Sequence, residues 1–255
     1  MQEPSLPMQM PAFRQVHSGH GVEWWSSAWQ LLFQRGAAVT WIAMCFIAMA
    51  IYGLLHLFSL LGLIAAHITL FVFAGGLMLA ARKTEAGTAP AVGDLFAGFS
   101  QSLGPLAIGG ALLMVAALLV LSAATVAGIG ALSGAASGAL SGNLALLAGL
   151  GATTLLVALV SLILLLPIAL AAWFAPALIV LRRQPPVEAL KASLSACWAN
   201  LGALAVYGLL WIAFAIIASI PLGLGWLVLA PLMVLSTYAA YQDLFETQQA
   251  SDAGG

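Results

Sequence analysis

Two pairs of histidines are the side chains in this sequence best suited to hold a metal or a haem. His56 and His67 flank a short turn between two apolar runs, so they would meet at facing ends of two helices. Imidazole nitrogens are common ligands of zinc, copper and iron. A single pair supplies only two ligands, and we therefore interpret both residues as polar interfacial side chains that are hydrogen-bonded locally. His17 and His20 lie in an N-terminal tail, where we expect no metal either.

Other patterns that carry chemistry are missing from the sequence. It has no HExxH motif, no GxxxxGK phosphate loop, no dinucleotide glycine fingerprint after a strand and no CxxC pair. Cys45 and Cys197 are its only cysteines, and we expect two free thiols, one within the membrane and one on the cytoplasmic side. We therefore predict that the protein is not an enzyme and binds no cofactor, metal or nucleic acid.

The composition places the chain in a membrane. Of its 255 residues only 7 are Lys or Arg and 8 are Asp or Glu, 63% are apolar, and the mean hydropathy is +1.10. Soluble domains carry about 25% charged residues. A soluble fold of this size could not bury so much apolar surface, which predicts an all-α, polytopic bundle of membrane-spanning helices.

The charges fall in four clusters that locate the spans. Charge-free runs of 46, 87 and 51 residues separate them. Because a spanning helix needs about 20 apolar residues, the first and last runs hold two helices each, and the middle run holds two helices and a surplus. The predicted spans are 37–58, 61–81, 104–127, 153–181, 201–220 and 223–241, with turns at Ser59-Leu60 and Pro221-Leu222.

Six spans put every charge cluster on one side of the membrane. Cytoplasmic loops carry an excess of Lys and Arg, so we expect both termini in the cytoplasm of a bacterial inner-membrane protein. The residues that set this topology are Arg35, Arg82, Lys83, Arg182, Arg183 and Lys191. The domain boundaries that follow are a flexible tail over 1–18, one transmembrane domain over 19–245 and a disordered tail over 246–255.

A short amphipathic segment precedes each helix pair. Apolar residues follow Val22 at helical spacing in the first segment and Val187 at the same spacing in the third, and the series from Val92 is a weaker second case. We expect these helices to lie in the cytoplasmic membrane interface, with packing against the bundle as the alternative. Aromatic rings favour the headgroup level, and the expected interfacial anchors are Trp24, Trp25, Trp29 and Trp198.

Two features of the architecture stay open at this stage. The three units of amphipathic segment and two spans are either true repeats or share only the composition of membrane helices. The surplus Gly128–Gly151 carries Gly130, Gly134, Gly138 and Gly142 at four-residue spacing. Such spacing suits a tightly packed or re-entrant helix, whereas the glycine content equally suits a flexible outer loop.

Several segments of the chain, taken in order, carry a family resemblance. They are Trp24–Phe33, Gly75–Arg82, Asp94–Phe99, Glu188–Ser193 and Tyr238–Phe245. Together they resemble an uncharacterised family of proteobacterial inner-membrane proteins, over roughly residues 19–245. The resemblance implies a bacterial inner membrane and supplies no substrate or catalytic residue.

Two functions remain possible on the sequence. The first is a non-enzymatic scaffold or accessory protein that contacts the lipid bilayer and a membrane-protein partner or a second copy of itself. The second is a small, uncoupled permease or carrier for an uncharged or apolar solute. We favour the first, because no span contains an ionisable residue that could couple transport to a proton, apart from His56 and His67 at the span ends.

Overall fold

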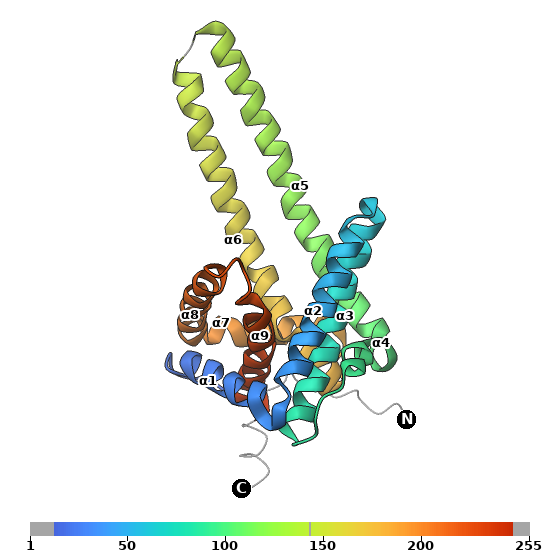
Figure 1. The fold of residues 1–255 in the computed structure, drawn as a ribbon. Coiled ribbons are helices and arrows are strands. Elements are labelled where there is room, and N and C mark those ends of the chain that lie inside the picture. The colour runs from blue at the N-terminus through green and yellow to red at the C-terminus, as the bar shows by residue number, and fades with distance from the viewer. Residues whose placement is uncertain (1–12, 143, 247–255) are drawn as a thin grey trace, which may run out of the picture. The chain divides into compact units, whose positions relative to one another are not determined.

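A computed structural model describes residues 13–142 and 144–246, and its described residues form helices and no strands (Figure 1). The α-helices are α1 (His20–Phe33), α2 (Ala38–His56), α3 (Ser59–Glu85), α4 (Ala97–Gln101), α5 (Leu103–Ser141), α6 (Leu144–Arg182), α7 (Pro186–Ala199), α8 (Leu201–Ser219) and α9 (Trp226–Tyr241). Short helical turns η1 (Gln34–Gly36), η2 (Val92–Phe96) and η3 (Gln242–Glu246) adjoin them. Six helices are long and apolar enough to cross a membrane, which confirms the predicted polytopic helix bundle.

Four of the six predicted spans agree closely with the helices, and their ends have clear local causes. The first turn lies at Leu57-Phe58, two residues before its predicted place, and the last covers the predicted Pro221-Leu222. Gly87, with a φ of 78°, follows the end of α3, where an αL glycine commonly ends a helix. Arg183, with a φ of 53°, ends α6, and Pro186 starts α7 at the position where proline is favoured.

The middle pair differs from the prediction. Neither a re-entrant helix nor a flexible loop occupies Gly128–Gly151, because α5 and α6 run as continuous helices of 39 residues each and turn at Gly142, whose φ is 67°. Hydroxyl groups in these helices donate hydrogen bonds to backbone carbonyls three or four residues earlier, as at Ser133, Ser137 and Thr153. This back-bonding satisfies their hydroxyls inside an apolar helix.

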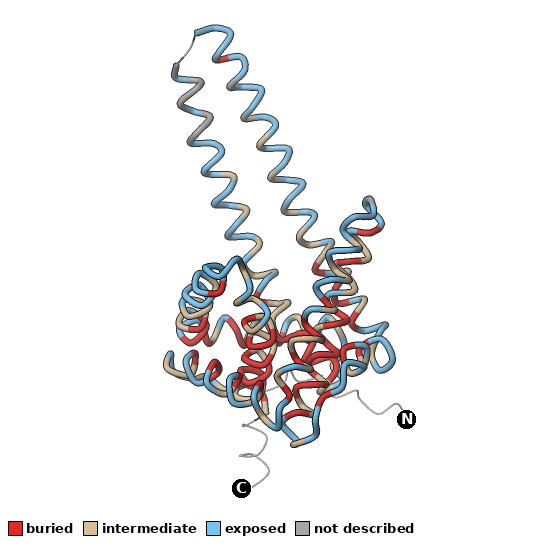
Figure 2. The backbone as a smooth tube through the Cα atoms, viewed as in Figure 1, coloured by how far each residue is buried: buried red, intermediate tan, exposed pale blue. Residues whose placement is uncertain are grey.

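The chain divides into two compact units, where we expected one domain. One unit is residues 111–170, the outer parts of α5 and α6, and most of its described side chains are exposed. The other combines residues 1–110 and 171–255 and contains most of the buried side chains (Figure 2). Its largest fully buried side chains come from several helices and include Trp41, Phe73, Phe174, Tyr238 and Phe245.

The amphipathic segments dock on this second unit by a repeated contact. They align on Val22, Val92 and Val187, and in each segment the sixth residue after the valine is small and buried: Ala28, Gly98 and Ser193. A Cβ on Gly98 would stand 2.3 Å from the carbonyl oxygen of Val72 in α3. Ser193 Oγ accepts a hydrogen bond of 3.0 Å from the backbone N–H of Phe174 in α6.

These contacts fall at matching places in the helix pairs. Val72 directly precedes the segment Phe73–Met78, and Phe174 begins its counterpart Phe174–Ile179. The second segment thus packs on the second helix of the first pair, and the third segment on the second helix of the second pair. α1 packs on α9 and α8, the third pair, and so closes the series. The second and third segments thus make similar contacts, through Gly98 and Ser193.

The described residues include parts of both predicted tails. Residues 1–12 and 247–255 lie outside the described residues. Within the expected flexible tail, Arg14 donates its backbone N–H to Leu244 and its side chain pairs with Asp243, and Val16 N–H donates to Asn200 Oδ1 at 2.8 Å. Residues 13–18 are therefore bound to the core, and so is Glu246 through Arg82.

Candidate functional site

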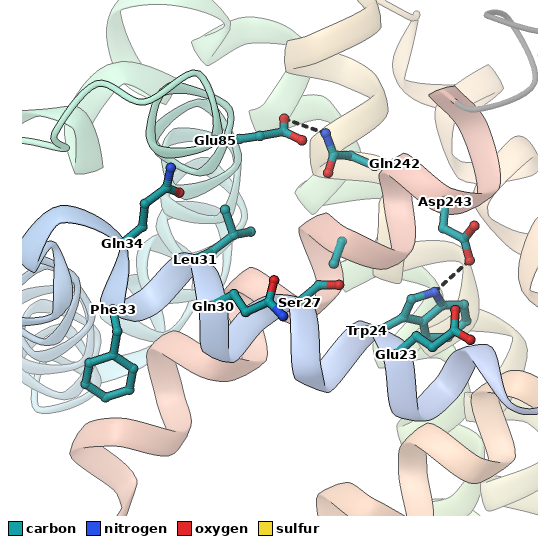
Figure 3. Close-up of a pocket in the computed structure, with 11 residues that line it drawn as sticks. Glu23, Trp24, Ser27, Gln30, Leu31, Phe33, Gln34, Glu85, Gln242 and Asp243 are labelled. Carbon is teal, nitrogen blue, oxygen red and sulfur yellow. Dashed lines mark hydrogen bonds between the residues drawn. The ribbon is translucent and has the colours of Figure 1, made fainter.

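A polar pocket opens where the charged helix ends meet, in a region we call the charged layer: α1, η2, α4, α7, η3 and the adjoining ends of α3, α6 and α9. The pocket has a volume of about 720 Å³ and lies between α1, the end of α3 and the end of α9 (Figure 3). Its polar lining is Glu23, Ser27, Gln30, Gln34, Glu85, Gln242 and Asp243, and its apolar lining is Trp24, Leu31, Phe33 and Ala239.

Asp243 joins the N-terminal segment to the last helix pair. One carboxylate oxygen pairs with the Arg14 guanidinium, and the other accepts from Trp24 Nε1 at 2.9 Å and contacts His20 Nδ1 at 2.7 Å. The Asp243 side chain is only 17% exposed. Because a carboxylate this far from water needs several donors, these contacts fix α1 against the end of α9.

Glu85 supplies a second carboxylate at the opposite end of the pocket. It accepts hydrogen bonds from Tyr238 Oη at 2.7 Å and from the side-chain amide of Gln242 (Figure 3). Neither donor is charged, and Glu85 forms no ion pair with the described residues. Its negative charge therefore remains available at the pocket surface.

Two arginines tie the other helix pairs to η3. Arg82, at the end of α3, pairs with Glu246, and Arg182, at the end of α6, donates to the carbonyl of Phe245. The Arg182 guanidinium also lies 5.7 Å from the centre of the Phe245 ring, within cation–π range. Phe245 itself is fully buried, so η3 is a shared anchor for the ends of all three pairs.

The lining of the pocket can attract a cation. It is lined by three carboxylates and no basic side chain. Within the described ranges no group of three or more His, Cys, Asp or Glu residues could hold a metal. His56 Nδ1 contacts the carbonyl of Tyr52 at 3.2 Å, the kind of local hydrogen bond that we expected for it, and His67 is half-buried in α3.

The expected tryptophan anchors divide into two kinds. Trp24 and Trp25 are core residues, 2% and 6% exposed, and Trp25 stacks on Tyr207 with ring centres 5.0 Å apart. Both side chains therefore pack α1 against the bundle. Trp29 and Trp198 are 54% and 61% exposed.

α1 has three distinct faces. One is buried and includes Trp24, Ala28 and Leu32. The second is apolar but exposed, and is formed by Val22, Trp29 and Phe33 at spacings of seven and four residues. The third is polar and turns toward the pocket, with Glu23, Ser27, Gln30 and Gln34. The buried face contacts the bundle, and the other two faces suit contact with lipid and with water, respectively.

α7 repeats this division. Its buried face consists of small residues, Ala189, Ala192, Ser193, Ala196 and Cys197. Opposite them lie Val187 and Trp198, which are exposed, and Leu190 and Leu194, which are half-buried. Burial raises the pKa of the Cys197 thiol to about 12, against a smaller opposing effect of the hydrogen bond with Ser193, so this thiol is protonated in the folded protein.

The topology-setting cations are mostly engaged. Lys83 pairs with Asp94 at 2.9 Å, and Arg35 Nη1 donates to the carbonyl of Gly87 at 2.6 Å. With Arg14, Arg82 and Arg182 these make five cations that contact an acid or a carbonyl. Arg183 and Lys191 make no ion pair or hydrogen bond with the described residues, and both are exposed.

The sequence did not identify the two carboxylates that organise the pocket. Asp243 lies 219 residues from Trp24, and Glu85 lies 153 residues from Tyr238. No spacing rule connects residues so far apart, and Asp243 stands near the C-terminus, next to the segment that we expected to be disordered. The one available signal was that these acids stand at helix ends beside aromatic residues.

Comparison with known proteins finds a relative of the chain. The chain is 33% identical over 224 residues to a protein of Burkholderia thailandensis named "Probable inner membrane protein", and the match covers 76% of this chain and 80% of the relative. No model of a protein family matches the chain. No solved structure matches it either.

Proposed function

Since the chain belongs to the family of this Burkholderia thailandensis inner-membrane protein, we propose that it is a non-enzymatic scaffold of a bacterial inner membrane, with both termini in the cytoplasm. The charged layer would hold the protein in the cytoplasmic interface and offer the polar pocket to a membrane-protein partner. The observation that carries the proposal is the division of α1 and α7 into a buried, an exposed apolar and a polar face.

The exposed apolar faces support contact with lipid. Val22, Trp29 and Phe33 would be an unfavourable surface in water, because burying one such side chain contributes roughly 1.5–3 kcal/mol. A helix that lies in the interface plane buries such a face about 5–10 Å below the headgroups and keeps its charged face wet. Glu23 and Gln30, on the neighbouring face, suit the wet side.

The position of the polar pocket supports a scaffold over a carrier. A path for a polar solute would require polar groups in the middle of the spans, whereas this pocket is lined by α1 and by the charged ends of α3 and α9. The three charge-free runs contain all six helices that could span the membrane, except for their charged ends.

Accessibility of spin labels in reconstituted vesicles tests the proposal. Single cysteines at Val22 and Trp29, in a background without Cys45 and Cys197, should be relaxed mainly by oxygen, which concentrates in lipid. Matched labels at Glu23 and Gln30 should be relaxed mainly by a water-soluble nickel chelate. Equal relaxation of both sets by the chelate would place α1 in water and reject the scaffold geometry.

A carrier for an apolar solute is the second candidate, and one observation favours it. An apolar groove of about 790 Å³ lies beside α8 and is lined by side chains that include Trp173, Tyr207, Trp211 and Met233. Vesicles that contain the protein should then take up an apolar dye faster than empty vesicles, and Gly208→Leu, which narrows the groove, should slow the uptake. Equal rates with and without protein would exclude the carrier.

A further inference from the structure

The outer face of α7 differs from that of α1 in its charge. Arg183 lies just before the helix and Lys191 in its second turn, and both are exposed, as are Val187 and Trp198 of the apolar stripe. They are the two of the protein's seven cations that have neither an acidic nor a carbonyl partner within the described residues. Beside α1, by contrast, the charged side chains that line the pocket are all acids.

Arg183 stands at a left-handed turn of the backbone. Its φ of 53° lies in the region where glycine is the least strained residue. Arg35 and Leu222 adopt the same region, with φ of 49° and 52°, whereas Gly87 and Gly142 carry glycine there. Arg183 therefore places an exposed charge at the end of α6 at some conformational cost.

We propose that the outer face of α7 is a docking surface for an anionic phospholipid of the cytoplasmic leaflet. Arg183 and Lys191 bind the phosphate group, while Val187 and Trp198 contact the upper part of the acyl chains. Guanidinium and ammonium groups are the natural partners of phosphate. Glu188 is the one acid on this helix, and it forms no ion pair with either cation among the described side chains.

This inference rests on the proposed interfacial position of α7 and adds the chemistry of the lipid. Cations near an anionic membrane surface each contribute a factor of about five in binding. Two free cations at one helix therefore predict a preference of roughly 25-fold for an anionic over a zwitterionic lipid.

Native mass spectrometry of the full chain tests the proposal, with phosphatidylglycerol and phosphatidylcholine as competing probes. The wild type should retain phosphatidylglycerol preferentially, and Arg183→Gln with Lys191→Gln should lose most of that preference. Arg35→Gln is the matched control, because it removes an exposed cation whose side chain is bonded to Gly87. The conservative exchange of Arg183→Lys with Lys191→Arg should keep the preference even if the neutral variant is unstable.

Three outcomes would overturn the proposal. The double variant could retain the wild-type preference, Arg35→Gln could lose as much as the double variant, or inorganic phosphate could displace the lipid where chloride at equal ionic strength does not. Spin labels at Val187 and Trp198 separate this failure from failure of the scaffold. Oxygen access without a lipid preference would reject only the anionic docking surface, whereas no oxygen access would reject the interfacial position itself.

Discussion

At the scale of single residues, one carboxylate organises the charged layer. The Asp243 carboxylate contacts the side chains of Arg14, His20 and Trp24, which come from the N-terminal segment and from α1. A carboxylate with three donors is held more firmly than one in a surface ion pair, because each charged hydrogen bond contributes about 1.5–3 kcal/mol. Exposed pairs contribute roughly 0–1 kcal/mol. The burial of Asp243 therefore makes its contacts structural.

Replacing Asp243 by Asn should destabilise the protein by about 2 kcal/mol, since the amide keeps one acceptor but loses the charge that Arg14 requires. The midpoint of unfolding in detergent, followed by tryptophan fluorescence, measures the effect. Glu23→Gln is the matched control, because its side chain is 62% exposed and should change stability by less than about 0.5 kcal/mol. Equal midpoints for the two variants would show that Asp243 is not an anchor.

The thiol of Cys197 should make stability depend on alkaline pH. Its pKa rises from 9.0 in the unfolded chain to about 12 in the folded protein, so folding favours the protonated thiol. The contribution of the thiol to the free energy of unfolding is therefore fully present below pH 9 and is lost as the pH rises from 9 to about 12. From pH 8 to pH 10 the loss should be about 1 kcal/mol. Comparing Cys45→Ala with the double variant Cys45→Ala, Cys197→Ala isolates the effect, and parallel pH profiles would contradict it.

At the scale of elements, the sequence revealed the amphipathic segments but did not separate the residues that pack on the bundle from those that remain exposed. The large apolar residues Val22, Trp29 and Phe33 mark a helix by their spacing, yet they remain exposed. Small residues such as Ala28 and Gly98 form the contact instead, because they let the backbones approach closely. Hydrophobic periodicity reports which side chains avoid water, and lipid satisfies that requirement as well as protein does.

The close contact of Gly98 predicts a sharp contrast between two neighbouring glycines. Gly98→Ala places a Cβ 2.3 Å from the carbonyl oxygen of Val72 and should cost about 2–3 kcal/mol, because α4 must move away from α3. Gly104→Ala meets no atom within 4 Å and should leave stability unchanged or raise it by up to about 1 kcal/mol. The midpoint of unfolding in detergent measures both effects. Similar midpoints for the two variants would show that Gly98 makes no close contact with α3.

At the scale of the molecule, charge placement predicted six apolar helices and their approximate limits, because 15 charged residues leave few positions for membrane boundaries. The anchoring by η3 and the long middle hairpin were not predictable in this way. Gly130, Gly134 and Gly138 suggested a break or a separate packed helix, since glycine weakens helices in water. In α5 the helix continues through all three glycines.

The length of α5 leads to a prediction about where the hairpin ends. Its 39 residues extend about 58 Å at 1.5 Å per residue, against about 30 Å of hydrocarbon. Fitting the whole helix into that layer would require a tilt of about 60°, beyond the roughly 0–40° seen for membrane helices. If Leu103 lies at the cytoplasmic surface, Ser122 remains within the hydrocarbon and Ser137 emerges on the far side.

Impermeant maleimide applied to intact spheroplasts tests this placement in a chain without Cys45 and Cys197. Ser137→Cys should react from outside, and Ser122→Cys, the matched serine of the same helix, should stay unlabelled until the membrane is dissolved. Both side chains are exposed on the helix itself, so protein packing does not explain a difference between them. Labelling of Ser137→Cys only after the membrane is opened would place the tip in the cytoplasm. That result would reverse the orientation that all seven cations imply.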